Sequence, residues 1–567
     1  MSRRDSNTSV VSIDNGEVSS TTALALTDAR FDLAAVDFQD FSTRPDTSLE
    51  HCGYKPFDLA NLAAAFHQKC TPGAIRRYIQ RYDKDEVKSK IHGLVHNHHI
   101  VTYAIHYHSV DCLRLLLEYG VDPQARDFGR VPVLAYAIML PYWNACNTLE
   151  MVRTLLAHGA SALHIPRDMW IDYVKTPSSG SDVRNRGGNK WCTVKVRKIL
   201  VETMHLSIRY TLWRASRLEF RPCRMLQIAE AKGILPLLRI PYLVIGQELG
   251  IEHVIEQIYA HIANDVDQPL VLAFSGLSGH GKTELASCMG GLISADFIDI
   301  DCTQITTVFS LLGTTAGYQE SENGSPLNNF LVRNNAKRNV VFLDEFDKTK
   351  REVREALLKV MDAGTYTGRP NNLKIDCTKT VWILATNKGD TEVAAFYAKE
   401  IAKRREDEID QVDIMPLQIE IAKLLSSLYS PAVCGRINAF IPFFPFSPGE
   451  QAVVAHKFIL NLQDRIRKPI DLKQPVCRYI GHSILRVVDD GRLCQKVAEG
   501  YVQALGARSL KREVTKVEKK FLKEYSKVDE VVTEASNQGK FERYIAQLQP
   551  VSDGVQDIVV YRDTEKD

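Results

Sequence analysis

Apolar residues recur at helical spacing along residues 57–165, and the pattern occurs more than once. VDCLRLLLEYGVDPQARD (residues 110–127) and LEMVRTLLAHGASALHIP (residues 149–166) share an apolar helix closed by Gly120 or Gly159. A glycine at that place suits a left-handed helix cap. The preceding segments, VTYAIHYH and VLAYAIML, also match each other. We therefore predict pairs of short helices, with the glycine cap at the end of each second helix.

A two-helix unit of about 33 residues resembles the ankyrin repeat, and NLAAAFHQKC…AIRRYIQRY looks like a weaker earlier copy. The TPLH signature of ankyrin repeats is absent, because VPVLAYA stands in its place. A generic α-helical solenoid is therefore the alternative. Either stack would offer a concave surface to a protein partner. The histidines of this region lack the spacing of metal ligands and are expected on helix surfaces and in loops.

After a polar linker (TPSSGSDVRNRGGNK), VRKILVETMHLSIRYTLWRAS is predicted to be helical. Three short apolar runs then follow, LVLAFSG, NVVFL and TVWILAT, which are typical of buried parallel strands. The first run leads into GLSGHGKT, a full match to the phosphate-binding loop pattern. Its glycines let backbone N–H groups face phosphates, and the next helix adds its dipole.

Lys282 is expected to reach the β- and γ-phosphates of ATP, and the Thr283 hydroxyl to hold Mg²⁺. No catalytic role is expected for His280, which occupies a variable position. The nucleotide-binding residues predicted in and beside this loop are Gly276, Ser278, Gly279, His280, Gly281, Lys282, Thr283 and Glu284.

The other two runs end in polar residues. Asp344 and Glu345 follow the second, at the strand edge where α/β sheets bind ligands. Asp344 is predicted to complete the Mg²⁺ shell and Glu345 to polarise the attacking water. Asn387 follows the third run and is an amide that could orient this water.

Hydrolysis also needs positive charge on the transition state, and an arginine supplied by a neighbour contributes about 10³–10⁵ in rate. Arg436 and Arg508 are the candidates. A surface salt bridge is the alternative reading of each arginine taken alone.

Composition narrows the class of protein. The chain has 567 residues, 71 Lys plus Arg and 69 Asp plus Glu, a balance that argues against a dedicated nucleic-acid binder. Its 12 cysteines are scattered and suit reduced thiols. No apolar run approaches the length of a membrane span, and the N-terminus lacks an apolar signal core. A cytoplasmic location is expected, with a mitochondrial one as the alternative.

The motifs VIGQ, GxxGxGKTELA, LDEFDK followed by ALLKVMDAGTYT, ATN, GRI and GAR occur in this order. Together they resemble the AAA+ module of the Clp chaperones, in particular the second ATPase ring of ClpB-type disaggregases. The resemblance implies an adenine pocket at Val244 and Ile245. It also implies three further roles: sensor 1 for Asn387, trans arginine finger for Arg436, and sensor 2 for Arg508. With the repeats, the layout is similar to that of the ankyrin-containing ClpB homologue of animal mitochondria.

In this family a pore loop of the form GYVG grips unfolded polypeptide with its aromatic side chain. Gly317 and Tyr318 agree with that form, whereas Gln319 and Glu320 replace the usual Val-Gly. A flat aromatic ring can contact any polypeptide without sequence preference. Packing of Tyr318 on its own domain is the alternative.

We therefore expect a multidomain protein with α-helical ankyrin-type repeats, an α/β P-loop AAA+ domain and a helical lid (α+β) subdomain. The predicted parts are a disordered arm (1–55), repeats (56–166), a linker with a helical segment (167–235), the large ATPase domain (236–445) and the lid with its tail (446–567). The lid includes a basic amphipathic helix, LKREVTKVEKKFLKEYSK, and a tail strand, QDIVVYRD.

The expected function is an ATP- and Mg²⁺-dependent unfoldase or disaggregase that forms one ring, a homo-hexamer, and threads unfolded or aggregated clients. Its repeats would recruit a substrate or protein partner, with no membrane and no nucleic acid involved. The alternatives are a nucleotide-gated ankyrin scaffold without threading, and a DNA-loading AAA+ protein.

Overall fold

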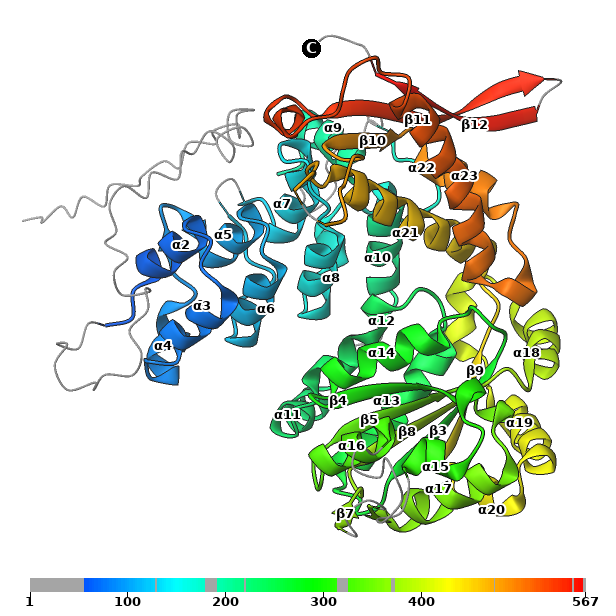
Figure 1. The fold of residues 1–567 in the computed structure, drawn as a ribbon. Coiled ribbons are helices and arrows are strands. Elements are labelled where there is room, and N and C mark those ends of the chain that lie inside the picture. Colours follow the sequence, from blue (N-terminus) through cyan, green and yellow to red (C-terminus); the bar gives the residue numbers. More distant parts are fainter. Residues whose placement is uncertain are drawn as a thin grey trace, which may run out of the picture. The chain divides into compact units, whose positions relative to one another are not determined.

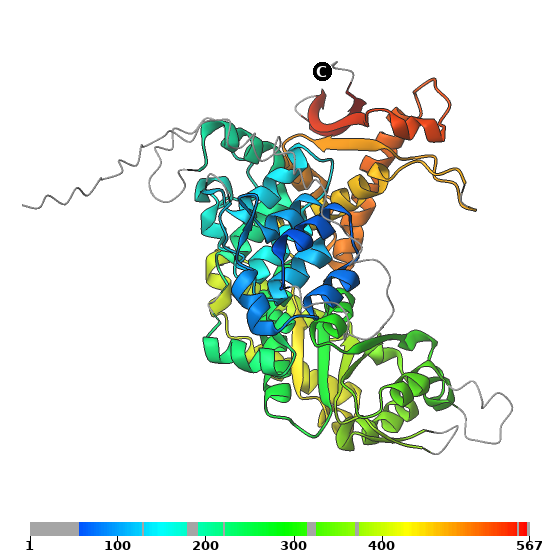
Figure 2. The same cartoon turned by 90° about the vertical axis from the view of Figure 1, so that its left-hand side faces the viewer.

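The computed structural model describes residues 56–127, 130–178, 191–218, 221–313, 325–368, 373–473, 475–552 and 555–563. Two compact units share these residues. The helical unit holds the residues up to Ile171 together with Pro177–Ile208, and the sheet unit holds Asp172–Thr176 and Arg209–Asp567. Figures 1 and 2 show the elements of each unit from two sides.

The helical unit consists of short helices in which each pair packs on the next, since α5 contacts α6 and α7, and α8 contacts both α6 and α7. Its helices are α2 (Leu59–His67), α3 (Pro72–Ile79), α4 (Lys84–Lys90), α5 (Ile100–His106), α6 (Val110–Glu118), α7 (Val133–Met139), α8 (Leu149–Ala157) and α9 (Val194–Thr203), and a hairpin joins β1 (Leu94–Val95) to β2 (His98–His99). The predicted helix pairs are thus present as α5–α6 and α7–α8, with α2–α3 before them.

The second helix of each main pair ends at the predicted glycine. Gly120 has φ +90° and Gly159 has φ +105°, values that side-chain-bearing residues rarely adopt. At α6, the Val121 N–H donates to the Leu116 carbonyl at 3.2 Å and the Gly120 N–H to the Leu117 carbonyl at 3.1 Å. This is the hydrogen-bond pattern of a Schellman cap, so the predicted left-handed caps are confirmed.

Two features of the helical unit differ from expectation. His98 is 7% exposed, and its Nδ1 lies 3.0 Å from Asp127 Oδ2, so placing it on a helix surface or in a loop was wrong. The helical stretch predicted after the linker is divided into α9 and α10 (Leu206–Ala215), because Met204 leaves helical geometry with ψ +73°. The amphipathic pattern runs through this break and therefore does not reveal it.

The sheet unit contains a five-stranded parallel sheet of order β4-β5-β8-β3-β9. The order places β3, which carries the phosphate loop, next to β8 and one strand away from β5. The strands are β3 (Leu270–Gly276), β4 (Asp296–Asp301), β5 (Asn339–Asp344), β8 (Thr380–Thr386) and β9 (Ala439–Phe443), and a hairpin joins β6 (Thr365–Thr367) to β7 (Lys374–Asp376).

Helices cover both faces of this sheet (Figure 1). They are α11 (Cys223–Ala231), α12 (Ile240–Leu243), α13 (Glu248–Ala263), α14 (Lys282–Leu292), α15 (Val308–Leu312), α16 (Pro326–Arg333), α17 (Arg351–Ala363), α18 (Asp390–Phe396), α19 (Met415–Leu428) and α20 (Pro431–Cys434).

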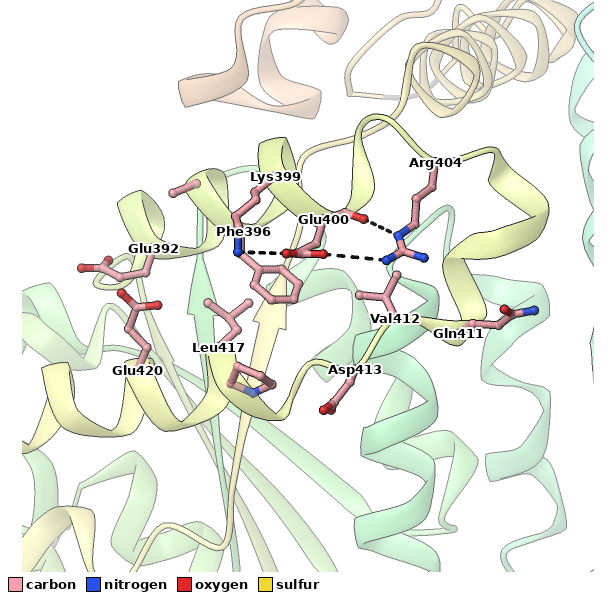
Figure 3. A pocket seen from close by; sticks show the side chains of 12 residues that line it. Glu392, Phe396, Lys399, Glu400, Arg404, Gln411, Val412, Asp413, Leu417 and Glu420 are labelled. Atoms are coloured by element: carbon pink, nitrogen blue, oxygen red, sulfur yellow. Dashed lines mark hydrogen bonds and ion pairs between the residues drawn. The ribbon is translucent and has the colours of Figure 1, made fainter.

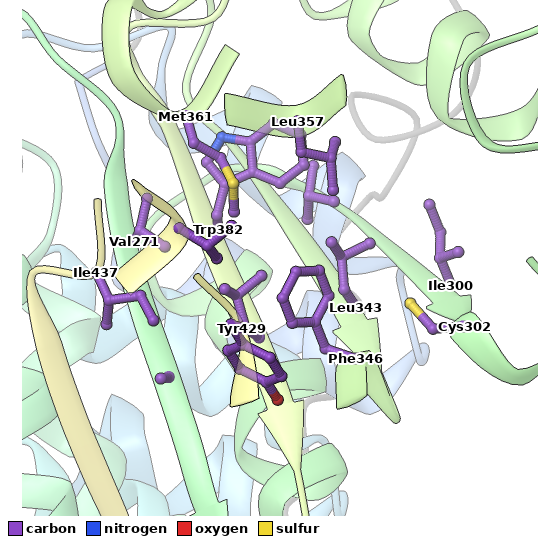
Figure 4. Close-up of a cluster of buried hydrophobic side chains, with 14 of the residues drawn as sticks. Val271, Ile300, Cys302, Leu343, Phe346, Leu357, Met361, Trp382, Tyr429 and Ile437 are labelled. Atoms are coloured by element: carbon purple, nitrogen blue, oxygen red, sulfur yellow. The ribbon is translucent and has the colours of Figure 1, made fainter. Parts of the chain in front are cut away.

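Side chains alternate between two apolar cores along the central strands. On β3, Val271 and Ala273 join one core, whereas Leu272 and Phe274 join the other. Figure 4 shows the first core, in which Trp382 and Phe346 lie among aliphatic side chains from several strands and helices. Burial on both faces explains why the three strand sequences read as continuous apolar runs.

A lid follows β9. It is built from α21 (Pro448–Arg467), α22 (Asp490–Ala498), α23 (Ala507–Tyr525) and the sheet β10-β11-β12 (Ser483–Val487, Glu542–Ser552 and Val555–Arg562). The predicted amphipathic helix is α23 and the predicted tail strand is β12. Among the described residues, no helix combines the length and the apolar character required to span a bilayer.

Candidate active site

The phosphate loop joins the carboxyl end of β3 to the first residue of α14. Gly276 has φ +132°, and a Cβ there would lie 2.5 Å from the Phe443 carbonyl oxygen of β9. Gly281 has φ +98° and caps α14. Only glycine fits both positions, because the backbone is left-handed at each and no room exists for a side chain at the first. The loop therefore presents backbone N–H groups and a helix N-terminus, which fit an anionic phosphate chain.

Lys282 is folded back onto this loop. Its Nζ donates to the carbonyls of Gly276 at 2.6 Å and Leu277 at 3.1 Å, and to Asn387 Oδ1 at 2.9 Å. Burial lowers the pKa of Lys282 to about 8, although the nearby carboxylates of Asp344 and Glu345 act in the opposite direction. A buried ammonium group held by neutral oxygens is suited to an incoming anion.

The acidic pair lies at the end of β5, which β8 separates from β3. The Thr283 hydroxyl is 3.5 Å from Asp344 Oδ2, so these two oxygen ligands already face each other. Hydroxyl and carboxylate oxygens are donors that Mg²⁺ prefers, and the set fits that cation. Glu345 follows in a left-handed conformation with φ +52°.

Asn387, at the end of β8, connects the ammonium group of Lys282 to the carboxylate of Glu345. While its Oδ1 accepts from Lys282, its Nδ2 donates to Glu345 Oε1 at 3.2 Å. The structure thus brings together five side chains predicted from three separate strand ends: Lys282, Thr283, Asp344, Glu345 and Asn387.

The lid touches the phosphate loop directly. The Ala507 N–H at the start of α23 donates to the Gly279 carbonyl at 2.9 Å. A Cβ on Gly279 would lie 2.3 Å from the Leu505 carbonyl oxygen, so glycine is also required there. Arg508 is exposed, and its positive charge contributes to lowering the pKa of Lys282. Glu284 forms an ion pair with Lys457 of α21.

His280 has a structural role that the sequence did not indicate. It is fully buried, its ring stacks on Phe446 with centroids 5.1 Å apart, and its Nε2 lies 2.8 Å from the Tyr501 hydroxyl. Its Nδ1 lies 2.9 Å from the Ser278 carbonyl. Because burial lowers the pKa of His280 to about 4, the ring is neutral. Nδ1–H therefore donates to the carbonyl, and Nε2 accepts from Tyr501. A histidine at a variable loop position gives no local signal of a partner 221 residues away.

The remaining predicted residues form three groups. Val244 and Ile245 are buried, and the Gly246 N–H that follows them donates to the Tyr210 hydroxyl at 3.0 Å. Arg436 donates hydrogen bonds to the Ala432 carbonyl at 2.8 Å and to Asp362 Oδ2 at 3.0 Å. In the described part of the chain, no hydrogen bond joins Arg436 to the phosphate loop. The predicted pore-loop residues Gly317 and Tyr318 lie outside the described residues.

A separate cavity of about 600 Å³ opens between α18, the π-helix η10 (Tyr397–Ile401) and α19. Figure 3 shows Glu400 between Lys399 and Arg404 at its edge, with Phe396 and Leu417 beside it. None of the predicted site residues lines this cavity.

A parallel α/β sheet with a phosphate loop, an acidic strand end and a polar amide on the neighbouring strand is the arrangement of a P-loop nucleotide-binding domain. Residues 267–440 match the family described as AAA domain (Cdc48 subfamily). The chain is also similar to ClpB chaperones, which is the resemblance that the motifs predicted. It is 28% identical over 279 residues to the chaperone protein ClpB of Chlamydia caviae, covering 47% of this chain and 29% of that protein.

The mitochondrial disaggregases of Bos taurus and Homo sapiens are 28% and 27% identical over 330 residues. The matches cover 53% of this chain and 46% and 44% of those proteins, so the chain spans less than half the length of each of these relatives. A solved structure titled "S. cerevisiae Hsp104:casein complex, Extended Conformation" is 20% identical, with a TM-score of 0.43, covering 64% of this chain and 61% of that one. A TM-score this low supports no argument about fold or function.

Proposed function

We propose that this protein is an ATP-driven unfoldase or disaggregase. The observation that carries the ATPase part is the bridge made by Asn387, which holds Lys282 and Glu345 at the mouth of a complete phosphate loop. The remodelling part is supported by the relatives named chaperone protein ClpB and mitochondrial disaggregase.

ATP with Mg²⁺ supplies the phosphoanhydride bond whose cleavage drives the motor. In this proposal Lys282 would hold the β- and γ-phosphates, and Thr283 with Asp344 would hold Mg²⁺. The loop glycines and the N-terminus of α14 would orient the phosphates. Val244 and Ile245 would line the adenine pocket.

Glu345 would take the proton of the attacking water, and Asn387 would keep that carboxylate directed toward it. A positioned general base contributes about 10²–10⁴ in rate. Arg436 would act on the site of a neighbouring subunit in a ring, a homo-hexamer, and Arg508 would report the nucleotide state to the lid. The ion pair between Arg436 and the half-exposed Asp362 is of a kind that a neighbour can displace at little cost.

Tyr318 would grip the polypeptide in the channel of the ring. The short helix pairs with Schellman caps support ankyrin-type repeats, which would recruit clients or a protein partner. The boundaries proposed for these parts are those predicted from the sequence.

The test is refolding of a heat-aggregated reporter, measured beside ATP turnover. Glu345→Gln is expected to bind ATP and retain the client without turnover. Tyr318→Ala is expected to hydrolyse ATP and fail to recover the reporter, whereas the exposed Tyr479→Ala is expected to behave as wild type. Recovery by Tyr318→Ala equal to wild type would exclude threading by this loop. Client binding that responds to nucleotide but persists unchanged in Glu345→Gln, without any refolding, would favour the ankyrin scaffold.

A further inference from the structure

Residues Asp172–Thr176 belong to the sheet unit, although the residues on both sides of them belong to the helical unit. We call this segment the strap. Its Tyr173 is 4% exposed and lies edge-on to Tyr210, with ring centroids 5.2 Å apart and an interplanar angle of 74°. Trp213 packs against the same ring at 5.0 Å. The strap is therefore anchored by a buried aromatic side chain and does not merely cross a surface.

We call residues 444–447, which connect β9 of the sheet to α21 of the lid, the hinge. The Tyr173 hydroxyl forms a hydrogen bond beside it. It donates to Glu406 Oε1 at 3.0 Å, and Glu406 begins η11 (Glu406–Gln411), a 3-10 helix that precedes α19. The same carboxylate oxygen accepts from Ser447 Oγ at 3.3 Å. Ser447 caps α21, the first helix of the lid. One carboxylate thus joins the strap to the residue at which the lid begins.

The remainder of the strap binds the lid itself, at the N-terminus of α22. Arg209 Nε donates to the Tyr173 carbonyl at 2.7 Å, and Arg209 Nη2 lies 2.7 Å from Asp490 Oδ1. The side chains of Arg209 and Asp490 are 1% and 9% exposed. The Thr176 hydroxyl donates to Asp489 Oδ1 at 2.8 Å. A buried ion pair of this kind is costly to break from one side, because the remaining charge stays buried.

Glycine at position 491 permits this approach. A Cβ on Gly491 would lie 1.7 Å from the Val174 carbonyl oxygen, so any side chain there displaces the strap. This close contact is independent of the Tyr173 hydroxyl and offers a second way to test the strap.

The side chains around the hinge also contact Gly246, which follows the proposed adenine-pocket residues Val244 and Ile245. The Tyr210 hydroxyl, whose ring packs on Tyr173, accepts from the Gly246 N–H. A Cβ on Gly246 would lie 2.7 Å from Glu450 Oε1, and Glu450 accepts from the Ser447 N–H at 2.8 Å. The strap, the hinge and the residue that follows Val244 and Ile245 therefore share one packed polar cluster.

We propose that the strap sets the position of the lid over the ATP site, with Tyr173 as its positioning residue. Glu406 holds the Tyr173 side chain beside the hinge, and Asp489 of the lid holds Thr176. Arg209 links the Tyr173 carbonyl to Asp490 of the lid. Any movement of the adjoining chain at Ile171 or Pro177 acts on the lid through these contacts. The turnover readout rests on the proposed ATPase function, whereas the lid readout does not.

The test uses the full chain with Tyr173→Phe, which keeps the ring and removes the hydrogen bond, and with Gly491→Ala, which displaces the strap and keeps the hydroxyl. Tyr479→Phe, at an exposed tyrosine, and Gly291→Ala, where a Cβ meets nothing within 4 Å, are the matched controls. Loss of a hydrogen bond to a charged group corresponds to about tenfold in an equilibrium. We therefore expect KM for ATP to rise about three- to tenfold in both strap variants with kcat changed less than twofold. Amide hydrogen exchange should become faster at residues 490–493 and 505–510.

Faster exchange spread evenly over the sheet unit with an unchanged KM would show a merely structural role and overturn the proposal. Unchanged exchange in the lid of both strap variants would overturn it as well. If the wild-type protein neither binds nor hydrolyses ATP, the proposed function fails, and lid exchange alone decides the strap. The double variant Tyr173→Phe/Glu406→Ala should show no more than the effect of the larger single change, because both remove the hydrogen bond between these two side chains. Additive effects of the two changes would show that Tyr173 and Glu406 do not act through their shared hydrogen bond.

Discussion

Asn387 donates a 3.2 Å hydrogen bond from its side-chain amide to Glu345, and its carbonyl oxygen accepts one from Lys282. The amide therefore orients the Glu345 carboxylate, the proposed general base. We expect Asn387→Ala to lower kcat about 10²-fold, a part of what a positioned general base contributes. Nucleotide affinity should change less than threefold, as measured by titration with a fluorescent ATP analogue. The exposed Asn264→Ala serves as the control, and an unchanged kcat would remove Asn387 from the mechanism.

Arg436 should matter for turnover and hardly at all for folding. Its ion pair with Asp362 is partly exposed, and such pairs contribute about 0–1 kcal/mol to stability. We expect Arg436→Ala to unfold within about 1 kcal/mol of wild type in a urea titration. ATP turnover should fall by about 10³-fold or more, as for a trans-acting arginine.

Mixing this variant with Glu345→Gln protein tests the trans arrangement. If each variant supplies the residue that the other lacks, mixed rings regain activity at some subunit boundaries. Mixtures that never exceed the average of the two parents would place Arg436 outside the neighbouring site.

Glu450 should make the stability of the sheet unit depend on pH. Burial, with a further contribution from the Glu248 carboxylate, raises the pKa of Glu450 to about 7 from 4.5. The folded state thus binds more protons than the unfolded state between these values, and stability falls as pH rises from about 5 through 7. The charges that face this group are Glu248, Arg214 and Glu406, and Ser447 donates its backbone N–H.

We expect Glu450→Gln to flatten this pH dependence and to be the more stable protein at pH 8, by on the order of 2–3 kcal/mol. Thermal unfolding of both proteins at pH 5.5, 7 and 8 provides the measurement. Parallel curves for wild type and variant over that range would show that another group is responsible.

The features that the sequence predicts correctly are local. The phosphate loop is a strand, a glycine-rich turn and a helix within adjacent residues, and the caps at Gly120 and Gly159 depend on the hydrogen bonds of a single helix end. The central strands are recognisable because both faces of β3, β5 and β8 are buried, which makes their sequences continuously apolar.

The contacts that the sequence does not reveal join residues far apart along the chain. Tyr173 and Glu406 are separated by 233 positions, and His280 and Tyr501 by 221. His280 belongs to an identifiable motif, but its partner Tyr501 is an ordinary tyrosine, and neither Tyr173 nor Glu406 belongs to a motif. A single sequence gives periodicity and spacing, and neither specifies which distant side chain fills a buried hydrogen bond.

The contact between His280 and Tyr501 leads to the last prediction. The Nε2 atom of neutral His280 accepts a hydrogen bond from the Tyr501 hydroxyl, between the phosphate loop and the lid. Tyr501→Phe therefore leaves a buried ring nitrogen without a donor. A buried unsatisfied polar atom costs about 1–3 kcal/mol. We expect Tyr501→Phe to lower the free energy of unfolding by that amount, and His280→Val to remove part of this penalty when the two are combined. Urea unfolding of the two single variants and the double variant measures the coupling, with Tyr479→Phe as the control for loss of an exposed hydroxyl. If the two changes add within about 0.3 kcal/mol, the residues act independently and the lid is not held to the phosphate loop through this bond.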